Sequence, residues 1–314
     1  MLAPMQGLTN SALRQCFIER YQPDMVFTEF VRVQSSSRKR VARGDFSDIL
    51  ASPASPPLIV QLIGNDPIAL ADAAQRLQAA GVRHLNLNVG CPYGRMTTGL
   101  TGGALLREPH TLESILKALR TVCRSSLSVK WRAGYDDHRQ WRELLPMFEA
   151  CGVDFLILHP RTVVQEYAGE ADHGITARVV RQTSLPVIAN GDIASVARAR
   201  HLLDGCGVAG LMLGRGALAD PLLFQRIRGR APATRDELQL RHQSGEFIAD
   251  LLPRYLEKFC GERQALMKLK DVLNFMTAPE LQRDLGKLKR ATTLSQFTQR
   301  LERYFFIAPP PSQR

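Results

Sequence analysis

The chain has 314 residues, a length that allows one large domain and a small second one. With 45% hydrophobic and 23% charged residues, its composition is typical of a globular protein. No run approaches the roughly 18 uninterrupted apolar residues of a membrane helix, and the first seven residues lack the features of a signal peptide. Six cysteines without any Cys-x-x-Cys pair argue against a zinc site and against a disulfide framework. We therefore expect a cytoplasmic protein without a metal.

The formal net charge is +11, from 41 Lys and Arg residues against 30 Asp and Glu residues. A field of this sign attracts a polyanion, and arginine in particular suits bidentate contacts to phosphate. The charge alone leaves two readings equally open, which are a nucleic-acid-binding protein and an ordinary protein of high isoelectric point.

In chain order, short apolar strands alternate with amphipathic helices, which is the pattern of parallel βα units. Helices are expected over 67–80, 109–123, 139–150 and 193–203. Eight strands point to a closed (β/α)₈ TIM barrel rather than an open sheet. They are expected over 1–4, 24–29, 58–63, 84–89, 128–132, 155–159, 186–190 and 209–214.

Beyond the barrel, Gly229 and Pro232 mark a linker, and no strand-like run follows it. Helical periodicity covers 235–258, 265–276 and 294–305, and the run of prolines at 309–311 cannot continue a helix. We expect a barrel domain over 1–230 and a small all-α domain over 231–314.

The fourth expected strand ends at a candidate catalytic residue. Asn86 and Asn88 share the face toward the barrel axis, where an amide needs a hydrogen-bond partner. We expect Asn86 to be satisfied by neighbouring backbone and Asn88 to hold a ligand. Cys91 follows in a glycine-rich stretch at the active end of the barrel, where its protonated thiol can serve as an acid. Its alternative role is that of a small buried hydrophobic residue.

The fifth strand places Lys130 and Arg132 on one face at its end, and two cations in a barrel mouth indicate an anionic ligand. A reduced flavin carries negative charge that a lysine stabilises. The alternative is a lysine that reaches to solvent.

The seventh and eighth strands end in Asn190-Gly191-Asp192 and Gly214-Arg215-Gly216. Glycine lets backbone amides approach a phosphate, and phosphate sites after these two strands recur in TIM barrels. Gln61 and His159 end the third and sixth strands.

Six segments together resemble the tRNA-dihydrouridine synthase family from residue 3 to the helical tail. They are Ala3-Pro4-Met5, the Asn-x-Gly-Cys-Pro of 88–92, Lys130-Trp131-Arg132, His159-Pro160-Arg161-Thr162, Asn190-Gly191-Asp192 and Gly214-Arg215-Gly216. The bacterial C branch, which modifies U16 of the D-loop, is the most similar part of the family. The segments that indicate it are 29–33, the Lys268-Leu269-Lys270 helix and Asn274-Phe275.

The resemblance implies bound FMN, NADPH as reductant, tRNA as partner, a monomer, and a helical domain that binds tRNA. Cys91 would be the general acid. The cofactor-binding residues would be Pro4, Met5, Gln61, Lys130, His159, Asn190, Gly191, Asp192, Gly214 and Arg215. Those that contact substrate or tRNA would be Arg32, Asn88, Tyr93, Arg95, Arg132, Tyr167, Lys268 and Lys270.

Some positions depart from the family pattern. Arg95 stands in place of the lysine that usually follows the catalytic Cys-Pro, which leaves its role open. Gln6 and Asp192 stand where glutamate is frequent, and Pro160 stands where glycine is.

The implied reaction follows from uracil, whose C5=C6 bond is conjugated to the C4 carbonyl. Hydride from flavin N5 adds at C6, and Cys91 protonates C5. The uridine must be flipped out of the tRNA to reach the flavin. Two alternatives stay open, an FMN barrel acting on a small molecule, such as a dihydroorotate-dehydrogenase-like enzyme, and a non-catalytic tRNA-binding protein.

Overall fold

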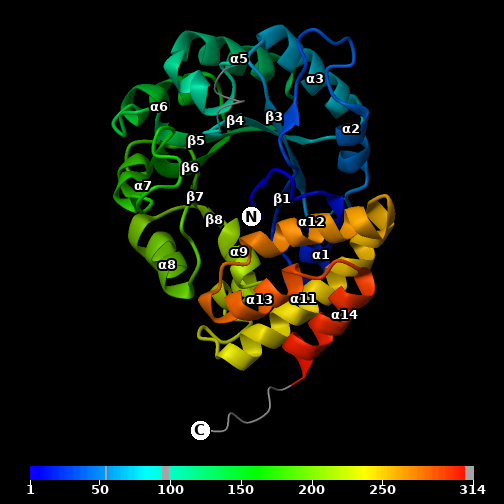
Figure 1. Cartoon of the computed structure of the whole chain (residues 1–314). Coiled ribbons are helices and arrows are strands. Elements are labelled where there is room, and N and C mark those ends of the chain that lie inside the picture. The colour runs from blue at the N-terminus through cyan, green and yellow to red at the C-terminus, as the bar shows by residue number, and fades with distance from the viewer. Residues whose placement is uncertain (54, 94–98, 308–314) are drawn as a thin grey trace.

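The computed structural model describes residues 1–53, 55–93 and 99–307, and in it a parallel sheet curls into a barrel (Figure 1). Its strands follow one another in the order β1-β3-β4-β5-β6-β7-β8, and β2 extends the pairing with β3. Their bounds are β1 Val26–Phe27, β2 Val31–Arg32, β3 Leu58–Ile63, β4 His84–Val89, β5 Ser126–Gly134, β6 Phe155–Thr162, β7 Val187–Asn190 and β8 Gly210–Met212.

A single residue closes the barrel. Leu2 forms parallel bridges to Val26 on one side and to Leu213 on the other, and its N–H donates to the Met25 carbonyl. The strand expected over 1–4 is therefore present as one bridging residue with its neighbours, and the predicted (β/α)₈ barrel is confirmed.

Helices surround the barrel and then form a group beyond it (Figure 1). Around the barrel lie α1 Ser11–Tyr21, α2 Arg43–Leu50, α3 Pro67–Ala79, η1 Gly102–Arg107, α5 Pro109–Val122, α6 Trp141–Ala150, α7 His173–Val180, α8 Val196–Arg200 with η2 His201–Gly205, α9 Arg215–Ala219 and α10 Leu223–Ile227. The later group contains α11 Glu237–Lys258, α12 Gly261–Phe275, η3 Pro279–Leu281, α13 Gln282–Lys289, α14 Leu294–Leu301 and η4 Glu302–Phe306. None of the helices in the described ranges is long and apolar enough to cross a membrane.

The barrel interior is apolar in its lower half, toward the amino ends of the strands, and polar in its upper half, toward their carboxyl ends. Alternate residues of the strands point inward, and a small apolar cluster that includes Ile59, Ile157 and Ile188 fills the lower layer. Two residues further along the same strands stand Gln61, His159 and Asn190. The change from isoleucine to polar side chains therefore marks the carboxyl ends of the strands as the functional end.

The C-terminal helices share one hydrophobic core with the barrel. Phe247 of α11 packs on Phe17 of α1, with ring centroids 5.6 Å apart, and also contacts Tyr21. Arg226 of α10 pairs with Asp220 at 2.9 Å and donates to the Pro232 carbonyl, so it fixes the segment that leads into α11. The segments before and after residue 230 are thus packed together.

A buried charge network joins α1, α2 and α11. Arg14, which is fully buried, pairs with Asp48 at 2.8 Å, and Lys258 reaches the same carboxylate at 2.7 Å. The backbone N–H of Ser11 also donates to Asp48. Burial alone would raise the pKa of Asp48, but these partners outweigh it and lower the pKa to about 2.

We expect Asp48→Asn to lower the free energy of unfolding by about 3–5 kcal/mol at pH 7, because Arg14 loses its ionised partner. The folded pKa is depressed, so the stabilisation is present above the unfolded value near 4 and is lost as pH falls toward 2. Urea denaturation at pH 7 and at pH 3 measures the difference. Asp24→Asn, at an exposed carboxylate, is the control, and equal losses in the two variants would refute the network's contribution.

Candidate functional site

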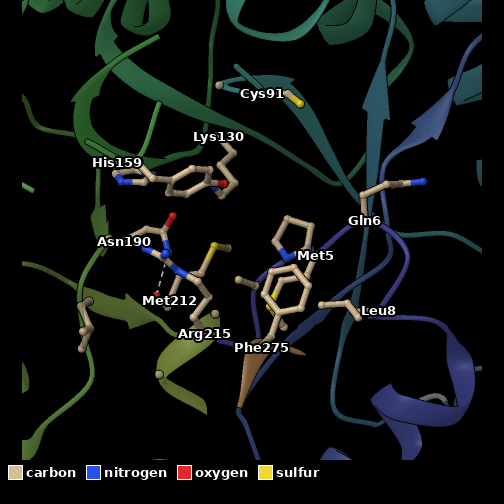
Figure 2. A pocket seen from close by; sticks show the side chains of 18 of the residues that line it. Met5, Gln6, Leu8, Cys91, Lys130, His159, Asn190, Met212, Arg215 and Phe275 are labelled. Atoms are coloured by element: carbon tan, nitrogen blue, oxygen red, sulfur yellow. Dashed lines mark hydrogen bonds between the residues drawn. The ribbon is translucent and has the colours of Figure 1, made fainter. Parts of the chain in front are cut away.

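A cavity of about 680 Å³ opens at the carboxyl ends of the strands. Its size falls in the range of small-molecule sites. Figure 2 shows Lys130, His159 and Asn190 on one side and Met5, Gln6 and Leu8 on the other, with Cys91 at the rim. The candidate residues that line it are Pro4, Met5, Gln61, Asn88, Cys91, Tyr93, Lys130, Arg132, His159, Tyr167, Asn190, Gly191, Asp192, Gly214 and Arg215.

The turn that carries Cys91 is held by Asn88. The Oδ1 atom of Asn88 accepts the backbone N–H groups of Gly90 and Cys91, each at 3.0 Å. On the other side, Gly103 donates its N–H to the Cys91 carbonyl at 3.0 Å. A Cβ atom on Gly103 would lie 2.6 Å from Val163, so only glycine allows this approach. The thiol is therefore carried on a firmly held backbone.

Lys130 brings a positive charge into the cavity. Among the residues that the structure describes, no hydrogen-bond partner for its ammonium is found. Burial, together with the nearby Arg132, lowers the pKa of Lys130 to about 8. A half-buried ammonium that faces the cavity without a hydrogen bond to the described residues favours an anionic ligand atom.

The Arg132 guanidinium is held by backbone carbonyl oxygens. Its N–H groups donate to the carbonyl oxygens of Gly90, Thr162 and Glu166, at 2.9, 2.8 and 2.5 Å. These carbonyl oxygens accept hydrogen bonds from the buried Arg132 cation, whereas the Lys130 ammonium has no such acceptor among the described residues. Arg132 instead ties β5 to the Cys91 turn and to the end of β6.

Two tyrosines stand at the cavity mouth. The Tyr167 ring lies under two guanidinium groups, 4.8 Å from that of Arg215 and 5.4 Å from that of Arg132. Tyr93 is next to it, with ring centroids 6.1 Å apart. Both rings are partly exposed, which suits contact with a planar ligand entering from solvent.

The ends of β7 and β8 form a close backbone cradle. Gly191 has φ +111°, and a Cβ atom there would lie 2.8 Å from the His159 ring. Asp192 pairs with Arg161 at 2.6 Å and with Arg215 at 3.6 Å. Burial would raise the pKa of Asp192, but the Ala171 N–H and Arg161 hold it below its ordinary value. The carboxylate thus fixes two guanidinium groups beside the cradle.

His159 is a neutral residue in this site. Burial, followed by the cations Lys130, Arg132 and Arg161, lowers its pKa well below the ordinary value. Its Nε2 atom lies 2.9 Å from an Nη atom of Arg161, which can only donate, so Nε2 accepts and Nδ1 carries the proton.

The structure adds residues to the site that the sequence did not single out. Arg161 is buried on β6 and holds both His159 and Asp192. Its position two residues after His159, on the same face of the strand, was the available signal. Phe275, at the end of α12, reaches the cavity beside Met5 (Figure 2). Its contact depends on tertiary packing and had no local signal.

Four predicted residues lie away from the cavity or outside the described ranges. Arg32 is exposed on β2. Lys268 contacts Asp271 at 3.3 Å, and the Lys270 ammonium donates to the Ala291 carbonyl at 2.5 Å. Arg95 lies outside the described residues.

A barrel with a cationic cavity at the carboxyl ends of its strands and a thiol at the rim has the architecture of a TIM-barrel enzyme. Within the described ranges, no group of three or more His, Cys, Asp and Glu side chains could hold a metal ion. The family model "Dihydrouridine synthase (Dus)" matches residues 1–305, and the chain belongs to this family.

Relatives of known name agree with this membership. The chain is 32% identical over 306 residues to tRNA-dihydrouridine synthase B of Vibrio parahaemolyticus, covering 90% of this chain and 92% of that protein. It is 33% identical to a probable tRNA-dihydrouridine synthase of Rhodobacter capsulatus, covering 82% and 78% of the two chains.

Solved structures support the fold. Morphinone reductase in complex with tetrahydroNAD superposes with a TM-score of 0.54 at 13% identity, covering 73% of this chain and 86% of that one. An old yellow enzyme homologue from Zymomonas mobilis gives 0.53 at 12% identity, with 75% and 87% covered.

Proposed function

We propose that the protein reduces a uridine of tRNA to 5,6-dihydrouridine. The observation that carries the proposal is the Cys91 thiol at the rim of a cavity that is also lined by Lys130, whose ammonium has no hydrogen-bond partner among the described residues. Membership of the dihydrouridine synthase family and relatives named tRNA-dihydrouridine synthase support it.

The cavity fits FMN by its chemistry. Gly191 and Gly214 line the cavity, where their backbone N–H groups can approach a phosphate, and the cavity is also lined by Arg215. Lys130 would neutralise the charge of the reduced ring system. We propose as FMN-binding residues those inferred from the sequence, which are Pro4, Met5, Gln61, Lys130, His159, Asn190, Gly191, Asp192, Gly214 and Arg215. When bound and reduced by NADPH, FMN supplies a hydride for C6 of the base.

The protein's own residues then have separate tasks. Cys91 donates the proton that C5 requires, and its thiol becomes a thiolate that solvent reprotonates. Asn88 holds the Cys91 turn through Oδ1 and has a second Nδ2 hydrogen with which to bind a carbonyl oxygen of uracil. Tyr93, Tyr167 and Arg132 border the entrance through which the flipped base arrives.

Four finer assignments belong to the same proposal. The substrate is U16 in the D-loop, and this assignment is based on the segments of the chain that resemble the C branch. NADPH is the reductant. Residues 231–314 form the tRNA-binding part, to which Arg32 and Arg95 add contacts from the barrel. The protein acts in the cytoplasm as a monomer.

The test is reduction of tRNA that lacks dihydrouridine, by purified protein with FMN and NADPH. Position-resolved mass spectrometry should find dihydrouridine at position 16. Dihydrouridine at another position only would overturn the C-branch assignment. Reduction of orotate without any reduction of tRNA would favour a small-molecule oxidoreductase, and failure to bind FMN would favour a non-catalytic tRNA-binding protein.

Lys268 and Lys270 provide a prediction for tRNA binding. Replacing both by alanine should weaken the binding and lower the slope of its salt dependence by up to about two, because each phosphate contact contributes about one. Lys270→Ala alone should also lower thermal stability, since its ammonium bonds to Ala291. Binding titrations at several salt concentrations measure the slope.

The control for this prediction is Lys117→Ala on α5, whose side chain is 63% exposed and which lies across the barrel from α12 (Figure 1). An unchanged slope in the double variant would remove both lysines from the tRNA interface.

A further inference from the structure

A chain of buried hydrogen bonds runs from the Cys91 turn down the inside of the barrel. Asn88 Nδ2 donates to Gln61 Oε1, and Gln61 Nε2 donates to Asn86 Oδ1, each at 2.8 Å. Asn86 Nδ2 then donates to the Ser128 hydroxyl at 2.8 Å, and this hydroxyl donates to the Leu85 carbonyl at 3.3 Å. We call Gln61, Asn86, Asn88 and Ser128 the amide relay.

The polarity of the amide relay is fixed at both ends. At the top, the N–H groups of Gly90 and Cys91 can only donate, so the oxygen of Asn88 must face them. At the bottom, the Leu85 carbonyl can only accept, so the Ser128 hydroxyl must donate to it. Every amide between the two ends therefore has one orientation. A reversed amide would put two acceptors or two donors in contact.

The two lower members of the amide relay, Asn86 and Ser128, do not reach the cavity. Gln61 and Asn88 line the cavity, whereas Asn86 and Ser128 do not. Both lower residues are fully buried, and they replace the apolar side chains that fill this layer on neighbouring strands. Polar side chains here are costly unless they are satisfied.

We propose that Asn86 and Ser128 are positioning residues that fix Cys91 as proton donor through the amide relay. They orient Asn88 so that its oxygen holds the Cys91 turn and its remaining N–H is available to the uracil. The catalytic part of this inference rests on the proposed reduction of uridine, whereas the positioning of the turn does not.

The experiment compares Ser128→Ala with Ser128→Thr, which retains the hydroxyl. In Ser128→Ala, amide hydrogen exchange should become roughly fivefold faster at Gly90 and Cys91, because the acceptor Oδ1 of Asn88 is no longer held in place. Exchange in β6 and β7 should stay as in the wild type. Ser128→Thr should show the slow exchange of the wild type at Gly90 and Cys91.

The matched control is Ser244→Ala in α11, which removes an equally buried hydroxyl that has no hydrogen-bond partner within the described ranges. It should leave exchange at Gly90 and Cys91 unchanged. If Ser128→Ala does not fold, Asn86→Ser takes its place with the same expected exchange pattern. Wild-type exchange at Gly90 and Cys91, or faster exchange across the whole barrel, would overturn the proposal.

Steady-state kinetics test the catalytic consequence. Ser128→Ala should lower kcat for tRNA reduction by about tenfold while the KM for tRNA stays unchanged, because only the position of the proton donor is disturbed. Wild-type kcat together with faster exchange would overturn the catalytic link. A wild-type protein that reduces no tRNA would instead refute the proposed function, and the exchange result would still stand.

Discussion

Replacing Cys91 by alanine will leave FMN binding and flavin reduction by NADPH intact, and will lower the rate of uridine reduction by about 10²–10⁴-fold. This is the range that a positioned general acid contributes. The thiol is carried at the cavity rim on a turn fixed by Asn88 and Gly103, so removing one sulfur atom deletes the acid without disturbing the backbone. Stopped-flow measurement of the two half-reactions separates the effects.

Other groups in the cavity are less suited to donate this proton. His159 has a pKa well below its ordinary value, and its Nε2 atom already accepts a hydrogen bond from Arg161. Burial raises the pKa of Tyr93. Lys130, with a pKa lowered to about 8, is the strongest competitor. Near-normal oxidation of the reduced flavin by tRNA in Cys91→Ala would transfer the role to Lys130. Cys91→Ser, which retains a weaker acid, should be intermediate.

The sequence predicted the bounds of the middle strands better than those of the first strands, where the barrel closes. Strands expected over 58–63 and 84–89 are β3 and β4 with the same bounds. The first is a short, nearly continuous apolar run, the second alternates apolar with polar residues, and turn residues flank both. The closing strand is one bridging residue, Leu2, too short for any periodicity. Among the described helices, the predicted ranges did not include α1, α2, α7, α9, α10 and α13. All of these except α1 have eight residues or fewer, which is little more than two turns over which to show a helical periodicity.

The site was predictable as a set of residues but not as a set of bonds. Strand ends identified Cys91, Lys130 and the glycines after β7 and β8, since parallel strands bring their carboxyl ends together. The bonds of Arg132 to three carbonyls and of Lys270 to Ala291 depend on segments distant in the chain. Spacing within one strand or helix carries no information about such partners.

Asn86 illustrates the same distinction. The sequence predicted that neighbouring backbone would satisfy its amide, but the partners are the side chains of Gln61 and Ser128. The amide relay needs one residue from each of β3 and β5 and two from β4, in a register that only the assembled sheet defines.

Lys130→Met will lower the midpoint potential of bound FMN by roughly 30–60 mV, the equivalent of one charge-assisted hydrogen bond of about 1.5–3 kcal/mol in a two-electron couple. The half-buried ammonium lines the cavity and has no hydrogen-bond partner among the described residues, so its charge acts on an anion that enters the cavity. Methionine keeps the length of the side chain and removes the charge. Spectroelectrochemistry measures the potential, and stopped-flow mixing with NADPH should show slower flavin reduction.

Two variants separate charge from shape in this prediction. Lys130→Arg retains the charge and should recover most of the potential, although its larger head group fits the cavity less well. Lys117→Met removes a lysine that is 63% exposed on α5, and should leave the potential unchanged. A potential in Lys130→Met equal to that of the wild type would show that Lys130 does not stabilise the reduced flavin. The lowered pKa of Lys130 would then reflect burial beside Arg132 alone.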